Sequence, residues 1–152
     1  MAFSIQQLNT GNTLEDASLS LTLDPVAAIF TETDWVPGDS ANSVINVENT
    51  SGVDVNYFVS FDWRPVAGGT PQDAQLLAER LEVTVTADPG GTPTVLYTGP
   101  LGGLVSQPPA GRALADAADE DVEFAISLPV DAGNIVQGVG IEFDIVFVAV
   151  NQ

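Results

Sequence analysis

Apolar and polar residues alternate along much of this 152-residue chain, and a period of two is typical of β-strands with one buried face. The clearest run covers residues 55–63, in which most alternate positions carry large apolar side chains. Such strands cannot bury an apolar face alone, so we expect two sheets packed against each other. Similar runs predict further strands at residues 18–23, 26–31, 43–49, 81–87, 94–98, 122–128 and 139–149.

Turn-forming residues separate these runs. Pro37 and Gly38 predict a turn over residues 35–39, because proline fixes φ and glycine accepts a positive φ. Further turns are expected at the polar and glycine-containing segment 49–52 and at the Gly/Pro-rich segment 88–93, and residues 99–111 are expected to form a long connection that is only partly ordered. About eight strands separated by such turns predict an all-β sandwich or jelly roll.

One short helix is expected as an insertion in this β fold. Thr70 suits the N-cap position, Pro71 suits the first helical position, and Asp73 places an acid in the first turn. Ala74 and Leu77 then follow at helical spacing.

The composition indicates a single folded domain. Hydrophobic residues make up 45% of the chain, which is too many for a disordered protein. No apolar run approaches the roughly 18 residues of a membrane-spanning helix, so no membrane insertion is expected. The first residues lack the basic and apolar regions of a signal peptide, so an exported protein would be a mature chain with Met1 added.

The chain is strongly acidic, with 21 acidic residues against three basic ones and a net charge of −18. The basic residues are Arg64, Arg80 and Arg112. Phosphate backbones and anionic membrane surfaces would be repelled, so no nucleic-acid partner is expected. The acidity has three interpretations: adaptation to high salt, loading with divalent cations, and plain solubility. The absence of lysine favours salt adaptation, because salt screens self-repulsion.

Side chains for the common catalytic mechanisms are missing. The chain has no histidine and no cysteine, which excludes disulfides, zinc sites with nitrogen or sulfur ligands, and Ser-His-Asp or Cys-His catalysis. The lack of lysine also excludes a Ser-Lys pair. Carboxylate pairs that could hydrolyse glycosides are so numerous that no pair is informative. The sequence therefore predicts that the protein is not an enzyme.

The densest acidic cluster covers residues 116–121, where Asp116, Asp119 and Asp121 are candidate ligands for Ca²⁺. Their spacing differs from that of an EF-hand loop. The favoured interpretation is a solvated loop before a strand that begins at Val122.

Three aromatic residues, Trp35, Tyr57 and Trp63, are candidates for a sugar-binding platform. Core packing is the favoured interpretation, because Tyr57 and Trp63 share the apolar face of the 55–63 strand.

Asn49-Thr50-Ser51 is a sequon for N-glycosylation, whose occupancy the sequence leaves open.

The N-terminal segment has a pattern of its own. Phe3 and Ile5 alternate with polar residues, Leu8 lies nearby, and a polar hinge follows at residues 9–13. A short apolar strand on a flexible hinge can add to the open edge of another subunit's sheet, whereas the alternative is pairing within its own sandwich. We therefore expect a donor-strand segment and hinge at residues 1–13, followed by a jelly-roll domain at residues 14–152.

Several short motifs occur in an order that resembles the TasA/camelysin family over roughly residues 18–152. The resemblance implies a jelly-roll domain, secretion, and assembly into extracellular filaments. A protease activity has been described for camelysin, but this chain has no histidine and no HExxH motif, so that activity is not carried over. The motifs are Trp35-x-Pro37-Gly38-Asp39, Asn49-x-Ser51-Gly52, Leu81-Glu82-Val83-Thr84-Val85, Leu96-Tyr97-x-Gly99-x-Leu101, Leu128-Pro129 and Asn134-x-x-Gln137-Gly138.

Together these observations predict a secreted structural subunit that forms a homopolymer. Phe3, Ile5 and Leu8 would insert into the next subunit, and such a head-to-tail contact does not close, so it produces fibres. The alternative is a monomeric secreted binding or adhesin module that recognises carbohydrate or depends on calcium. A further apolar stripe, Val146, Val148 and Val150, lies on the outer face expected for the last strand and needs a cover of its own.

Overall fold

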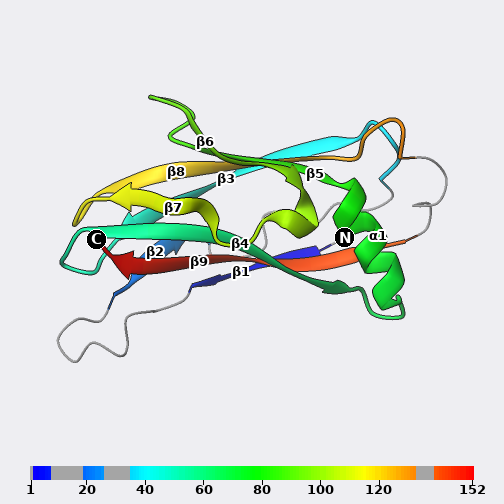
Figure 1. Ribbon diagram of the computed structural model, residues 1–152, viewed down its shortest axis with the longest axis horizontal. Helices are drawn as coiled ribbons and strands as arrows, with labels where there is room; N and C mark the ends of the chain where they lie inside the picture. The colour runs from blue at the N-terminus through cyan, green and yellow to red at the C-terminus, as the bar shows by residue number, and fades with distance from the viewer. Residues whose placement is uncertain (1, 8–18, 26–34, 133–138) are drawn as a thin grey trace.

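A computed structural model describes residues 2–7, 19–25, 35–132 and 139–152, and it shows two β-sheets packed face to face with one short helix at an end of the sandwich (Figure 1). The all-β sandwich with a helical insertion, predicted from the sequence, is confirmed. The four-stranded sheet A has the order β1 (Ala2–Gln7), β9 (Ile141–Asn151), β4 (Val55–Pro65) and β7 (Gln107–Leu114). The five-stranded sheet B has the order β2 (Leu21–Asp24), β3 (Ser40–Asn49), β8 (Asp119–Ser127), β5 (Glu82–Ala87) and β6 (Thr94–Pro100).

The core lies between the two sheets and follows the predicted alternation. On β4, Val55, Tyr57 and Val59 are fully buried, and Phe61 stacks on Phe143 of β9 with ring centroids 4.5 Å apart. Phe124 of sheet B stacks on Phe61 from the other side of the core. Aromatic pairs of this kind hold the sheets together through both area burial and ring geometry.

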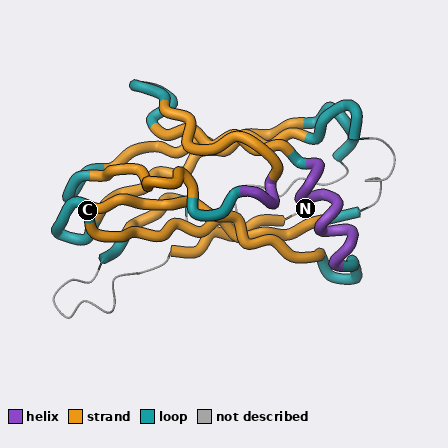
Figure 2. Tube along the Cα trace, viewed as in Figure 1, coloured by secondary structure: helices purple, strands orange, loops and turns teal. Residues whose placement is uncertain are grey.

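The helix α1 (Pro71–Arg80) begins where its capping residues place it. The hydroxyl of Thr70 accepts a 3.2 Å hydrogen bond from the backbone N–H of Asp73, and Pro71 occupies the first turn. Leu77 and Ala78 face the core, and the chain leaves the helix at Leu81 to enter β5. Figure 2 shows α1 at the end of the sandwich opposite the C-terminus.

Two boundary predictions are wrong. The segment expected as a long connection contains a short 3₁₀ helix, η1 (Leu101–Gly103), and most of strand β7, which pairs with the edge of β4. Strand β8 begins at Asp119 rather than at Val122, so Asp119 and Asp121 lie in a strand and not in a solvated loop. The strand expected at residues 26–31 lies outside the described residues.

Strand β9 passes between β1 and β4 and is covered on both faces along its middle. Its inward side chains, such as Phe143 and Phe147, lie in the core. On the outer face, Asp144 and Val146 are also buried, at 5% and 9% exposure, whereas Val150 is exposed. The outer apolar stripe is therefore graded from a covered middle to an exposed end.

Candidate functional site

The edge of sheet A formed by β1 is the first candidate interface. β1 pairs with β9 in parallel, with Phe3 opposite Phe143 and Ile5 opposite Ile145 in the register. The strand is six residues long, and its place at the sheet edge means that one neighbour, β9, holds it by backbone pairing (Figure 1). Of the three predicted donor residues, Phe3 and Ile5 lie on this strand, and Leu8 lies outside the described residues.

A small ionic cluster lies on the outer face beside this edge. The Arg64 guanidinium on β4 reaches two acids of β9, with Nε 3.5 Å from Glu142 and a terminal nitrogen 3.3 Å from Asp144. Asp144 is opposite Ser4 of β1 and Asp62 of β4 in the register. Because Asp144 is buried, Arg64 supplies the opposite charge that a buried carboxylate needs.

The other sheet edges of the described chain are poor templates for a further strand. Strand β7 carries Pro108 and Pro109, and its register with β4 is interrupted between Tyr57 and Val59. In sheet B, β6 ends at Pro100, and β2 has only four residues. Proline and short length are the usual means by which proteins prevent strand addition at an edge.

A partly buried polar cluster, which sequence patterns did not indicate, links the two sheets. The Tyr57 hydroxyl donates to Oε1 of Glu120 at 2.7 Å, and Arg112 donates to both carboxylate oxygens, at 3.0 and 2.9 Å. Burial, followed by the negative charge of Glu120, raises the pKa of the Tyr57 hydroxyl far above its usual value of 10. The hydrogen bonds that Arg112 donates to Glu120 raise the pKa of the Arg112 guanidinium. A glutamate at an inward position of an alternating strand was the signal that could have revealed it.

The three predicted calcium ligands are only partly brought together. Asp119 and Asp121 accept hydrogen bonds from the same Asn46 amide, at 2.8 and 3.0 Å, whereas Asp116 lies in the preceding turn, where its N–H donates to Asp54. In the described part of the chain, no group of three or more acidic side chains is arranged to hold a metal ion. Calcium binding at this cluster stays a prediction.

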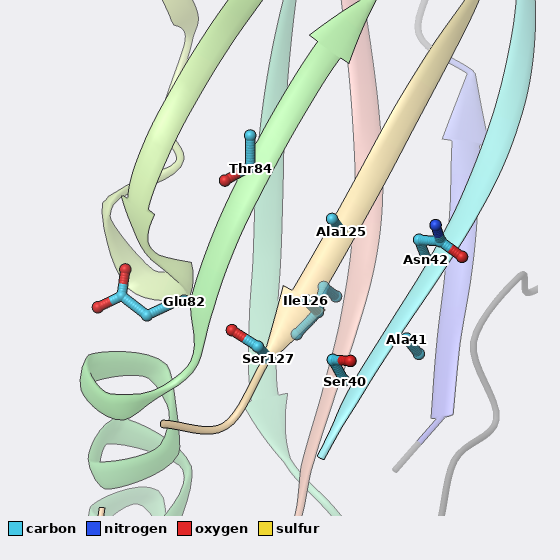
Figure 3. A pocket seen from close by; sticks show the side chains of 8 residues that line it. All are labelled: Ser40, Ala41, Asn42, Glu82, Thr84, Ala125, Ile126 and Ser127. Carbon is cyan, nitrogen blue, oxygen red and sulfur yellow. The ribbon is translucent and has the colours of Figure 1, made fainter. Parts of the chain in front are cut away.

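The outer face of sheet B has a shallow hollow of about 300 Å³ (Figure 3). Ala125 of β8 lies between Asn42 of β3 and Thr84 of β5, and its small side chain leaves the space. Small and polar side chains surround it, and no aromatic ring lies among its lining residues, which are Ser40, Ala41, Asn42, Glu82, Thr84, Ala125, Ile126 and Ser127.

A second hollow, of about 410 Å³, lies between α1 and the η1 turn and is here called the Trp63 hollow. Its lining residues are Trp63, Gln75, Ala78, Glu79, Pro100, Gly102 and Gly103.

Of the three aromatic residues considered for a sugar platform, Tyr57 is fully buried, and Trp35 packs against the core. Trp63 packs against the core and also borders this open space.

The asparagine of the Asn49 sequon lies in the interior, whereas Thr50 is exposed. Asn49 is fully buried, and its amide nitrogen donates to the carbonyls of Val53 and Leu114 at 2.7 and 3.0 Å. Its amide oxygen accepts from the N–H of Ser51 at 2.9 Å. Both amide hydrogens are therefore used within the fold.

Comparison with known proteins gives little beyond this geometry. No family model matches the chain, and no curated protein matches it. One solved structure, a family 123 glycoside hydrolase from Clostridium perfringens, is similar at 12% sequence identity and a TM-score of 0.33. The match covers 76% of this chain and 22% of that enzyme, and a likeness this low carries no functional argument. Among the described residues, no helix has the length and apolar character required to cross a membrane.

Proposed function

We propose that this protein is a secreted, non-catalytic structural subunit that polymerises head to tail into an extracellular filament. The observation that carries the proposal is the parallel pairing of β1 with β9 at an edge of sheet A. In the filament, β1 of one subunit takes the same place beside β9 of the next. The backbone hydrogen bonds are then the same within one chain and between chains, so exchange loses no pairing.

The other sheet edges support head-to-tail assembly through the β1–β9 edge. The prolines of β7 and β6 and the short β2 disfavour strand addition elsewhere, so the β9 edge is the best acceptor in the described chain. Each subunit then donates β1 to one neighbour and receives β1 from another. This contact is heterologous, so repeating it extends the assembly into a fibre. The net charge of −18 opposes unspecific association of subunits.

A pair of introduced cysteines tests the exchange directly, because the natural chain has none. Gln6 and Val146 are opposite each other in the register, and neighbouring strands lie about 4.8 Å apart, within the Cα range of a disulfide. We expect fibres of the Gln6→Cys/Val146→Cys variant, after oxidation, to give a ladder of covalent multimers on a non-reducing gel.

The matched control is Thr84→Cys/Thr98→Cys, on neighbouring strands of one hairpin, where the two hydroxyl oxygens are 3.2 Å apart. This pair should close within one chain and run as a monomer. If fibres of the Gln6→Cys/Val146→Cys variant also ran only as cross-linked monomers, exchange of β1 would be wrong. Failure of the purified protein to form fibres by negative-stain microscopy under any salt condition would contradict the function itself.

A further inference from the structure

The Trp63 hollow is built from three parts of the chain. Strand β4 supplies Trp63, α1 supplies one wall through Gln75, Ala78 and Glu79, and the turn around η1 supplies the other wall. Gln75, Ala78 and Glu79 share one face of α1, because residues three and four positions apart are neighbours on a helix. The site is thus formed by regular elements and by one short turn.

The turn wall is held in place by several hydrogen bonds. The Tyr97 hydroxyl donates to the carbonyl oxygen of Pro100 at 2.6 Å, and the N–H of Leu101 donates to Leu81 at 2.8 Å. A Cβ on Gly103 would lie 2.5 Å from the Tyr97 hydroxyl and would displace it, and one on Gly102 would make a tight contact, 3.2 Å from the Ala78 side chain. These contacts preform the hollow, which lowers the ordering cost of binding a ligand.

The chemistry of the lining indicates the class of ligand. The indole of Trp63 and the ring of Pro100 give an apolar surface, and two helix side chains, Gln75 and Glu79, place polar groups on one side. Gln75 donates to Glu79 at 3.3 Å, and the amide oxygen and the other carboxylate oxygen can accept from ligand hydroxyls. A volume of about 410 Å³ is within the range of roughly 300–1,000 Å³ typical of small-ligand sites.

We infer that the Trp63 hollow binds a neutral saccharide, with one face of a pyranose ring stacked on the indole of Trp63 and its hydroxyls bonded to Gln75 and Glu79. The C–H groups on that ring face are complementary to the negative face of an aromatic ring. Acidic sugars are disfavoured by Glu79 and by the net charge of −18. This activity goes beyond the proposed filament function and does not depend on it, since a subunit could bind glycans before or after assembly.

Tryptophan fluorescence isolates the site, because the chain has only two tryptophans. In a Trp35→Phe background, Trp63 alone reports ligand binding. The full chain is titrated with cellobiose, maltose, mannobiose and diacetylchitobiose, and saturation-transfer NMR identifies which sugar protons contact the protein. We expect at least one of these sugars to change the Trp63 emission in a saturable way at concentrations up to about 10 mM.

Substitutions then assign the contacts. Gln75→Ala/Glu79→Ala changes only solvent-facing helix positions and should weaken binding about tenfold, whereas Gln72→Ala on the same helix should leave it unchanged. Trp63→Ala should abolish saturation transfer, with folding checked by circular dichroism. The inference is overturned if none of the sugars binds, if tetramethylammonium binds and sugars do not, or if the Gln75→Ala/Glu79→Ala variant binds as tightly as the unmodified chain.

Discussion

The hydroxyl of Tyr57 in sheet A donates a 2.7 Å hydrogen bond to Glu120 in sheet B, across the interior of the sandwich. The two residues are 63 positions apart in the chain, and Arg112 closes the cluster by pairing with both oxygens of the same carboxylate. A polar link between two packed sheets constrains how they slide against each other, because any shift leaves the buried Tyr57 hydroxyl without its acceptor.

The Tyr57 hydroxyl should make stability depend on alkaline pH. Burial raises the pKa of Tyr57 above its unfolded value of about 10, so the folded state retains this proton at pH values where the unfolded state loses it. This contribution to stability is complete below about pH 10 and is lost as the pH rises above it. Unfolding by urea from pH 8 to 11.5 should show the decline, and Tyr57→Phe should reduce it, whereas Tyr97→Phe should have a much smaller effect. Full ionisation of both tyrosines near pH 10 in a chain that stays folded would contradict the prediction.

Loss of Arg112 should destabilise the fold by about 2–3 kcal/mol, because it leaves the Glu120 carboxylate, with a side-chain exposure of 11%, without its cation. Urea denaturation of Arg112→Met measures the change in free energy of unfolding. The double variant Arg112→Met/Glu120→Met removes both charges and should recover part of the loss. Arg80→Met, at the exposed end of α1, is the matched control and should change stability by less than about 0.5 kcal/mol. Equal effects of Arg112→Met and Arg80→Met would show that the Arg112–Glu120 pair is not stabilising.

Deletion of residues 1–9 should abolish fibre formation and leave a folded, less stable domain, because the β9 edge then has no partner on that side. Phe3→Asp/Ile5→Asp should act in the same way, since a charge entering an apolar groove carries a large desolvation cost. A synthetic peptide of residues 1–9 should bind the truncated protein and stop growing ends. Electron microscopy gives the readout, with Ser4→Thr as a conservative control. Normal fibres from the truncated protein would contradict strand exchange by this segment. The contact between subunits would then be sought at the outer stripe of Val146, Val148 and Val150.

Salt should stabilise the folded or assembled protein. Acidic side chains lie on the outer face of sheet B, and Asn46 donates to two of them, Asp119 and Asp121. Repulsion falls as the Debye length decreases from roughly 10 Å at 0.1 M to about 3 Å at 1 M salt, so the melting temperature should rise over this range. The melting temperature of the Asp119→Asn/Asp121→Asn variant should rise less over the same range of salt.

Calcium binding by Asp116, Asp119 and Asp121 can be tested separately from salt screening. If these residues bind Ca²⁺, millimolar CaCl₂ should raise the melting temperature more than MgCl₂ at equal ionic strength. Equal effects of the two salts would exclude a specific calcium site.

The sequon at Asn49 should remain unmodified in folded protein, because both hydrogens of its amide nitrogen are bonded to carbonyls in the interior. Expression in a host that N-glycosylates Asn-x-Ser/Thr, followed by mass spectrometry, tests this. Gly90→Asn creates a matched sequon with Thr92 in the exposed turn between β5 and β6, and we expect that site to carry glycan. A folded chain that carried glycan at Asn49 itself would contradict the hydrogen bonding described for this residue.

Several elements could be predicted because their signals are local. The alternation of Val55, Tyr57, Val59 and Phe61 identified the buried face of β4, and Thr70 and Pro71 located the start of α1. Strand β7 was not predicted, because the interactions that form it are not local. Its segment contains Pro108, Pro109 and Gly111, which locally disfavour a strand, and it becomes one through pairing with the edge of β4.

By itself, the sequence determined the class of fold, the acidic surface, and the absence of histidine, cysteine and lysine chemistry, since periodicity and composition act over a few residues at a time. Only the tertiary structure decided that β1 lies parallel to β9, that Glu120 meets Tyr57 and Arg112, that Asn49 is enclosed, and that Trp63 borders a hollow. These relationships join segments far apart in the chain, and their energies depend on which surfaces meet. Local preferences limit those pairings, but the packing of the whole sandwich selects among them.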